Sequence, residues 1–301
     1  MSIYSLHEKG LLDVKETGNA TVSPDLTLAF AFDRGYAECF KVMLASMAEH
    51  GVLCRNPIVI YTDDEQLAND PIVAMAADRI SVLAGDRKSM LYTLAKDNVK
   101  RPERANWNRG TFLKWCIFEK QETSKLLFLD VDMLTLGSLK GLLDAYPNTP
   151  LVTCPQFQQS IRTENTDAQL KSMLEGNFDN KHKNRINSGV MLVNSELLNH
   201  EFFNEITQFA SERISIHEQG LLSEYFTKNR NMLGMASSRY NYQDSYLRMA
   251  SESVYTDILA NISVIHYAGS VKPWMDTSKP VETMPSISIW QQYKKLASNV
   301  L

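Results

Sequence analysis

The chain has 301 residues, 44% of them hydrophobic and 22% charged, and it carries a formal net charge of −4 at pH 7. This length suffices for one large domain or two small ones, and the slightly acidic balance excludes the broad basic surface that binds nucleic acids. The four cysteines include no C-x-x-C pair, which argues against a zinc knuckle or a disulfide framework. Residues 1–24 lack the pattern of a signal peptide, and no apolar run is long enough for a transmembrane segment, so we expect a cytoplasmic protein, free or at a membrane surface.

Short apolar runs alternate with amphipathic segments along most of the chain. The runs predict buried strands, and apolar residues that recur every three or four positions predict helices. In chain order, we expect strands at residues 26–32, 58–61 and 79–83, an amphipathic helix over 105–119, a central strand from Leu126, and strands at 151–154, 189–193 and 262–266. Further helices are expected after Tyr36, near residues 201–209 and near 218–226. This alternation is typical of an α/β fold with a mostly parallel sheet and helices on both faces.

The central strand ends in Asp130-Val131-Asp132. Ligands of open α/β sheets collect outside the carboxyl ends of the strands, and alternation places both carboxylates on the same side of the chain. Two carboxylates this close favour a cation between or beside them, and oxygen ligands favour Mg²⁺ or Mn²⁺. Alternatively, the triplet only caps the next helix or begins the turn at Gly137.

A second group of polar residues follows the last predicted strand. His266 would stand at the same edge of the sheet as Asp130 and Asp132, either as a third metal ligand or as a core histidine bonded to a backbone carbonyl. Gly269 allows the backbone to approach a ligand closely, and the charge of Lys272 suits a phosphate. Two aspartates, a histidine and a lysine are what a metal-bridged diphosphate needs.

Two further polar segments lie at predicted strand ends. The side chains of Asn187-Ser-Gly can hydrogen-bond sugar or ribose hydroxyls, although a plain polar turn explains them equally well. The long polar stretch from Gln156 to Arg185 follows another strand, and we expect either a lid over the site or a solvated surface loop. The chain has no P-loop, dinucleotide-binding fingerprint, H-E-x-x-H or nucleophile elbow, which excludes the enzyme classes that depend on them.

Six motifs together resemble glycosyltransferase family 8, which includes glycogenin and bacterial lipopolysaccharide galactosyl- and glucosyltransferases. They are Asp33-Arg-Gly-Tyr36, Phe128-Leu-Asp-Val-Asp132, Asn187-Ser-Gly189, Glu218-Gln-Gly-Leu-Leu222, Tyr240-Asn241 and His266-x-x-Gly269-x-x-Lys272-Pro-Trp274. The resemblance implies a nucleotide-sugar-binding domain of the GT-A type over residues 26–275, with an N-terminal extension (1–25) and a C-terminal segment (276–301). It also implies a UDP-hexose donor, with glucose or galactose favoured, and Mn²⁺ as the cofactor, with Mg²⁺ as the alternative.

The resemblance assigns roles to three groups of residues. The metal ligands are Asp130, Asp132 and His266. The residues that bind the donor are Phe32, Asp33, Tyr36, Lys114, Val131, Asn187, Gly269 and Lys272. The catalytic group is Gln219, beneath the anomeric carbon, together with Glu218 and Lys272. Tyr36 takes the stacking role at the uracil and ribose, and Lys272 contacts the diphosphate.

The matched site lacks the groups that two of the three transfer mechanisms require. No carboxylate or imidazole matches the base of an inverting transferase, and the amide of Gln219 is too weak a nucleophile for a double displacement. We therefore predict transfer with retained configuration onto a saccharide, a lipid-linked saccharide or a protein. One alternative is a nucleotidyltransferase, although Asp33-Arg-Gly-Tyr36 is a poor triphosphate loop. The other is a non-catalytic UDP-sugar-binding module, although such a module would be expected to have lost metal ligands.

Overall fold

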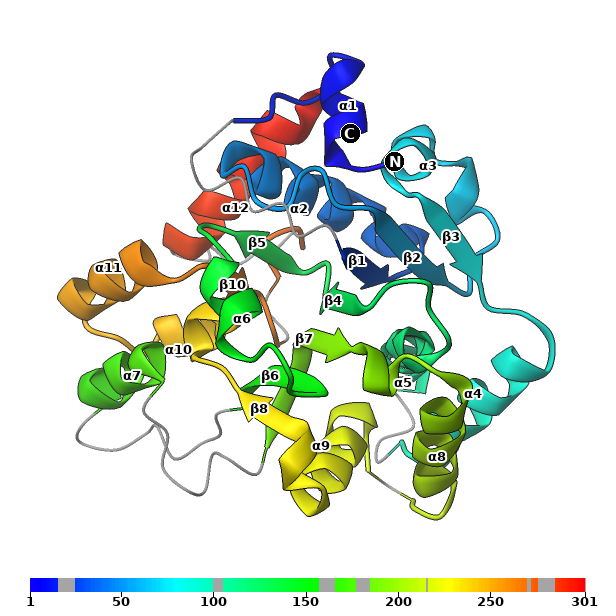
Figure 1. The fold of residues 1–301 in the computed structure, drawn as a ribbon. Helices are drawn as coiled ribbons and strands as arrows, with labels where there is room; N and C mark the ends of the chain where they lie inside the picture. The colour runs from blue at the N-terminus through cyan, green and yellow to red at the C-terminus, as the bar shows by residue number, and fades with distance from the viewer. Residues whose placement is uncertain are drawn as a thin grey trace.

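The computed structural model describes residues 1–15, 25–99, 105–156, 166–176, 185–214, 216–269, 272–275 and 285–300. Within these ranges the chain forms two sheets, and helices surround the larger one (Figure 1). No helix in this part of the chain is long and apolar enough to cross a membrane.

Seven strands form the main sheet, in the order β3-β2-β1-β4-β7-β6-β8. Six of them run in one direction, and β7 runs against them because it pairs antiparallel with both β4 and β6. The prediction of a mostly parallel sheet is therefore confirmed. The strands are β1 (Leu26–Ala31), β2 (Ile58–Thr62), β3 (Arg79–Val82), β4 (Lys125–Leu129), β6 (Leu151–Pro155), β7 (Ile186–Asn194) and β8 (Leu233–Met235).

A second, smaller sheet was not predicted. Its strands, in spatial order, are β5 (Met133–Thr135), β10 (Val264–His266) and β9 (Tyr242–Gln243). The strand expected at 262–266 is β10, so it belongs to this sheet and not to the main one. Strands of two or three residues are too short to show a period in the sequence. Because β5 directly follows β4 and its two aspartates, the small sheet borders the carboxyl end of β4.

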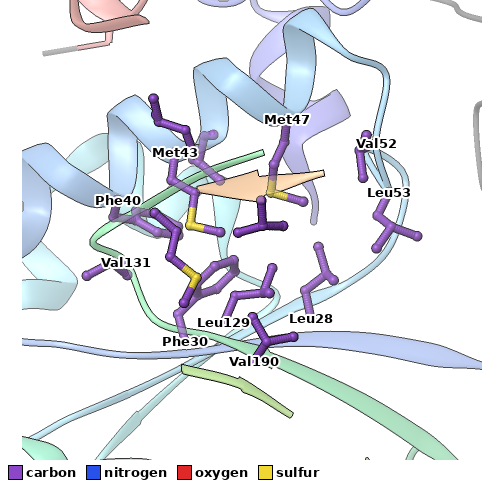
Figure 2. Close-up of a cluster of buried hydrophobic side chains, with 14 of the residues drawn as sticks. Leu28, Phe30, Phe40, Met43, Met47, Val52, Leu53, Leu129, Val131 and Val190 are labelled. Carbon is purple, nitrogen blue, oxygen red and sulfur yellow. The ribbon is translucent and has the colours of Figure 1, made fainter. Parts of the chain in front are cut away.

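Helices cover both faces of the main sheet, as predicted. Alternate residues of β1 belong to two separate hydrophobic clusters, with Leu28 and Phe30 in one and Ala29 in the other. Figure 2 shows the first cluster, in which Phe40 and Met43 of helix α2 face the strands. The α-helices of the described residues are α1 (Ile3–Glu8), α2 (Ala37–Glu49), α3 (Pro71–Ala76), α4 (Gly85–Asp97), α5 (Ala105–Phe112), α6 (Lys140–Ala145), α7 (Thr166–Glu175), α8 (His200–Ser211), α9 (Glu218–Lys228), α10 (Asp244–Leu247), α11 (Glu252–Asn261) and α12 (Pro285–Leu296).

Two predicted segments differ in detail from the structure. The helix expected over 105–119 is α5 followed by a 3₁₀ segment, η4 (Leu113–Phe118), whose six residues are all buried. The polar stretch from Gln156 to Arg185 contains helix α7 and is not wholly irregular. Residues 157–165 and 177–184 of that stretch lie outside the described residues, so the prediction of a lid is not tested.

The described parts of both flanking segments pack against the domain. In the N-terminal extension, Ile3 and Leu6 are fully buried, and the N–H of Lys15 donates to the carbonyl of Ala48 in α2 at 3.0 Å. In the C-terminal segment, α12 packs on the same helix, and its Trp290 is fully buried. Both segments therefore contribute to the hydrophobic core around α2.

Candidate active site

The two aspartates lie in the short connection between β4 and β5. The backbone N–H of Asp130 donates to a carbonyl of β7 at 2.8 Å, and the carbonyl of Asp132 accepts from the N–H of Tyr267 at 2.9 Å. The antiparallel pairing of β5 with β10 sets His266 opposite Met133, the residue after Asp132. The fold thus brings the three predicted metal ligands to one place.

The geometry of this cluster fits a divalent cation. Ligand atoms of Asp130, Asp132 and His266 lie within 4.8 Å of one another, and Nε2 of His266 is 3.2 Å from Oδ1 of Asp132. The other ring nitrogen, Nδ1, is 2.8 Å from Oδ1 of Asn241. An amide oxygen only accepts, so Nδ1 carries a proton, and the other ring nitrogen, Nε2, faces the carboxylates, where it could bind a cation. Carboxylate oxygens with one imidazole nitrogen form a donor set that suits Mn²⁺ or Mg²⁺.

Each aspartate also pairs with a lysine, the buried Lys114 and the partly buried Lys272. Nζ of Lys114 is 3.0 Å from Oδ1 of Asp130, and Nζ of Lys272 is 2.7 Å from Oδ2 of Asp132. Burial alone would raise the pKa of Asp132, but His266 and Lys272 lower it more, so that the pKa lies well below its ordinary value. The Asp132 carboxylate is therefore ionised and available to a cation.

Glu218 begins helix α9 and is a buried carboxyl next to this charge cluster. Its side chain is 2% exposed, and Oε2 accepts a hydrogen bond from Oγ of Ser188 at 3.0 Å. Burial is the main cause that raises the pKa of Glu218 to about 7. The negative charge of Asp130 raises this pKa as well, whereas the positive charge of Lys114 lowers it. Its burial favours a role in supporting neighbouring groups over direct contact with a sugar, and the predicted catalytic role of Glu218 stays a prediction.

The two amides predicted to line the donor sugar are held by backbone N–H groups of β7. Oε1 of Gln219 accepts from the N–H of Ser188 at 3.2 Å, and Oδ1 of Asn187 accepts from the N–H of Gly189 at 2.9 Å. Nδ2 of Asn241 donates to the same Asn187 oxygen at 2.9 Å. The metal-ligand cluster and the sugar-lining amides are therefore joined by hydrogen bonds.

The residues predicted to hold the nucleotide fall into two sets. Tyr36 is half-buried, its ring centre is 6.1 Å from that of Trp274, and burial together with the charge of Asp132 raises its pKa to about 12. Asp33 is exposed, and its Oδ1 accepts from the N–H of Gly35 at 2.8 Å, which caps the 3₁₀ turn η1 (Arg34–Tyr36). Tyr36 thus borders the charge cluster, whereas Asp33 is occupied in shaping the turn before it.

At three other predicted donor-binding positions, we expect any contact with the donor to come from the backbone. The side chains of Phe32 and Val131 are buried in the core, where Phe32 stacks on Phe40 with ring centres 4.9 Å apart. We therefore expect that only the main chain at these two positions could contact a donor. Gly269 has φ +108°, a conformation that is strained for any residue with a side chain, and no other part of the described chain lies within 4 Å of where its Cβ would be. Glycine is therefore required there by the backbone and not by a lack of space.

Three residues that hydrogen-bond to the predicted site residues could not be identified from the sequence. Asn241 and Ser188 belong to two of the sequence motifs, but the motifs alone assign them no role. Gln156 was regarded only as the start of a polar stretch, yet it contacts both Asn187 and Gln219. An isolated glutamine after a strand has no local signal, because its importance depends on which distant amides surround it.

Comparisons with known proteins agree with this arrangement. The model of "Glycosyl transferase family 8" matches residues 27–278. The chain is 22% identical over 276 residues to the lipopolysaccharide glucosyltransferase WaaO of Escherichia coli K12, covering 83% of this chain and 73% of that protein. It is 24% identical over 271 residues to a lipopolysaccharide 1,3-galactosyltransferase of Salmonella typhimurium LT2, covering 82% of this chain and 72% of that protein.

Solved structures show the same fold. LgtC, a galactosyltransferase solved with donor and acceptor sugar analogues, superposes with a TM-score of 0.60 at 21% identity and covers 90% of this chain and 95% of that one. An active-site mutant of LgtC gives 0.62 at 20% identity, covering 89% and 95%. These likenesses confirm the GT-A type of fold. Since the family model spans most of the sequence, the chain belongs to glycosyltransferase family 8.

Proposed function

We propose that this glycosyltransferase moves a hexose, glucose or galactose, from a UDP-sugar to a saccharide, glycolipid or protein acceptor, with a divalent cation and with retention of configuration. The observation that carries the proposal is the meeting of Asp130, Asp132 and His266 from two different sheets, with Nε2 of His266 facing the carboxylates. Membership in the family favours this activity over a nucleotidyltransferase. The glucosyl- and galactosyltransferase relatives support a hexose of one of these two kinds.

The chain's own residues would hold the donor from two sides. A divalent cation bound by the three ligands, Mn²⁺ foremost, would neutralise the diphosphate and stabilise the departing UDP. Lys272 supplies a point charge beside the same oxygens, because its Nζ already lies 2.7 Å from Asp132. Tyr36 borders the cluster at the end of β1, where it is suited to stack on the uracil.

Retention is supported by the groups near the expected anomeric carbon. Gln219 is an amide and a feeble nucleophile, while the neighbouring Glu218 carboxyl is almost fully buried and bonded to Ser188. Neither group is arranged to form a covalent sugar intermediate. We infer that the acceptor hydroxyl attacks from the face that UDP leaves, forms the new glycosidic bond as the bond to UDP breaks, and passes its proton to the leaving phosphate. An α-linked UDP-hexose then gives an α-linked product.

The proposal is tested by incubating the protein with a panel of UDP-sugars and measuring UDP release. We expect release from UDP-glucose or UDP-galactose with Mn²⁺, none in EDTA, and a fall on the order of 10³-fold in Asp132→Ala, because the cation supplies several kcal/mol of charge stabilisation. The purified product should show the small anomeric proton coupling of an α-linkage by NMR. Binding of UDP-sugar without any release would instead support the non-catalytic module, and a β-linked product would overturn the mechanism.

A further inference from the structure

Gln156, the residue after strand β6, lies at the centre of a group of four side-chain amides. Its carbonyl oxygen, Oε1, accepts from Nδ2 of Asn187 at 2.7 Å, from Nε2 of Gln243 at 3.0 Å and from Nε2 of Gln219 at 3.4 Å. The three donors belong to β7, β9 and α9, which are far apart in the sequence. A single side-chain oxygen, Oε1 of Gln156, therefore joins three elements that border the proposed donor site.

The orientation of these amides is determined by the backbone. The N–H groups of Ser188 and Gly189 can only donate, and they donate to Oε1 of Gln219 and Oδ1 of Asn187. The nitrogen of each amide must then point away from these two N–H groups, and on that side it meets Gln156. Gln156 can accept from both side-chain nitrogens only through its oxygen, and this is the orientation in the structure. The assignment of oxygen and nitrogen is thus consistent along the whole group.

The side-chain position of Gln219 depends on Gln156 more than that of Asn187 does. Its main chain is fixed in the first turn of α9, but a glutamine side chain has several rotatable bonds, and ordering it costs conformational entropy. Ser188 holds its oxygen, and Gln156 holds its nitrogen. Asn187, by contrast, is also bonded to Gly189 and Asn241. Loss of the Gln156 oxygen would free one end of Gln219 and leave Asn187 anchored.

We propose that Gln156 is a positioning residue of this transferase, whose carbonyl oxygen fixes the amide of Gln219 against the donor sugar. The inference rests on the proposed function, in which Gln219 lies beneath the anomeric carbon. Reactive groups must be held within about 0.5 Å of their productive position, so a loosened amide lowers the rate of the chemical step and not the binding of UDP. The proposed metal ligand His266 is oriented by Asn241, whose side-chain hydrogen bonds go to His266 and Asn187, so we expect cation affinity to be retained.

Three substitutions at Gln156 separate positioning from a general structural role. Gln156→Leu removes the acceptor at similar size, Gln156→Asn withdraws the oxygen by one methylene, and Gln156→Glu keeps an accepting oxygen for all three donors. We expect kcat to fall on the order of 10- to 100-fold in the first two, with Kd values for UDP and Mn²⁺ within about twofold of the unchanged protein. The Glu variant should recover most of kcat.

A matched control is Gln243→Leu, which removes another donor from the same oxygen without touching Gln219. We expect it to keep kcat close to that of the unchanged protein. A kcat of Gln156→Leu equal to that of the unchanged protein would overturn the inference, as would a Glu variant as slow as the Leu variant. So would a change confined to KM.

A readout without turnover keeps the inference testable on its own. In protein labelled with ¹⁵N-glutamine, the side-chain amide signals of Gln219 should shift and broaden in Gln156→Leu and Gln156→Asn, and they should remain in place in Gln243→Leu. Unmoved Gln219 signals would overturn the inference. If the proposed function is wrong, the unchanged protein will release no UDP, and this result is separate from the NMR signals of Gln219.

Discussion

At the scale of single residues, Lys272 contacts the carboxylate that we propose as a metal ligand. Its ammonium lies 2.7 Å from Oδ2 of Asp132 and 2.6 Å from the carbonyl of Tyr267, and its side chain is only 12% exposed. Lysine and cation therefore compete for Asp132, although both would favour a bound diphosphate. Removal of Lys272 is therefore expected to change the affinity for the cation and the affinity for the nucleotide in opposite directions.

Replacing Lys272 by Met should tighten Mn²⁺ binding without nucleotide and weaken UDP binding. Removing the ammonium releases Asp132 to the cation but takes a positive charge from the diphosphate, and a charged hydrogen bond of this kind is equivalent to about a tenfold change in Kd. Isothermal titration of each ligand measures both effects. Lys140→Met is the control, because Lys140 pairs with Asp144 at the exposed surface. Weakening of both ligands would contradict the competition.

The buried carboxyl of Glu218 should make stability depend on pH. Its pKa is about 7 in the folded protein, whereas an exposed glutamate titrates near 4.3, so between these values the folded chain binds more protons than the unfolded one. The free energy of unfolding therefore falls as pH rises through this range, and the whole loss, on the order of 3 kcal/mol, is present above the folded pKa. Below about pH 4 both states are protonated and the loss is absent.

Glu218→Gln removes the charged form and should remove this loss. Urea unfolding at pH 5 and pH 8 is expected to show that the variant loses less stability between the two values than the unchanged protein does. Glu212→Gln serves as a control, because Glu212 is exposed. An equal pH dependence in Glu218→Gln and the unchanged protein would show that Glu218 titrates as an exposed group does.

At the scale of elements, the last helix supports the segment that carries Lys272. In α12, Trp290 lies 5.7 Å from Trp274 between ring centres, and Nε2 of Gln291 donates to the carbonyl of Pro273 at 2.8 Å. Trp274 in turn contacts the ring of Tyr36. Residues beyond the family match at 278 therefore help to place side chains within it.

Trp290→Ala should destabilise the protein by about 3–5 kcal/mol, because it removes a fully buried aromatic side chain between α12 and the domain. Gln292→Ala, on the exposed face of the same helix, should stay within about 0.5 kcal/mol of the unchanged protein. Chemical denaturation of the three proteins measures the difference. A loss below 1 kcal/mol in Trp290→Ala would mean that α12 does not belong to the cooperative core.

The elements that could be predicted from the sequence are those with long periodic patterns. β1, β2 and β4 were predicted because their apolar runs are uninterrupted, and α8 and α9 because of helical spacing. The direction of β7 was not predicted, since a buried strand has the same pattern in either direction. The small sheet was missed because its strands have at most three residues. At the site, strand ends predicted Asp130 and Asp132, whereas Gln156 is recognised only from contacts between distant segments.

At the scale of the whole molecule, the site forms where two sheets meet. The main sheet delivers Asp130 and Asp132 at the end of β4, while the small sheet delivers His266 from β10. The boundaries predicted at residues 26 and 275 remain a prediction, because α1 and α12 pack on the domain without a visible break in the core. Because the proposed metal ligands come from both sheets, cation binding would report on the assembled fold.

Direct measurement of Mn²⁺ binding in the presence of UDP tests the central claim. By electron paramagnetic resonance or isothermal titration, the unchanged protein should bind one Mn²⁺ per chain. Asp132→Ala and His266→Ala should each weaken that binding on the order of 100-fold, with far-UV circular dichroism unchanged. Stoichiometric Mn²⁺ binding at unchanged Kd in both variants would contradict the assignment of Asp130, Asp132 and His266 as the metal site.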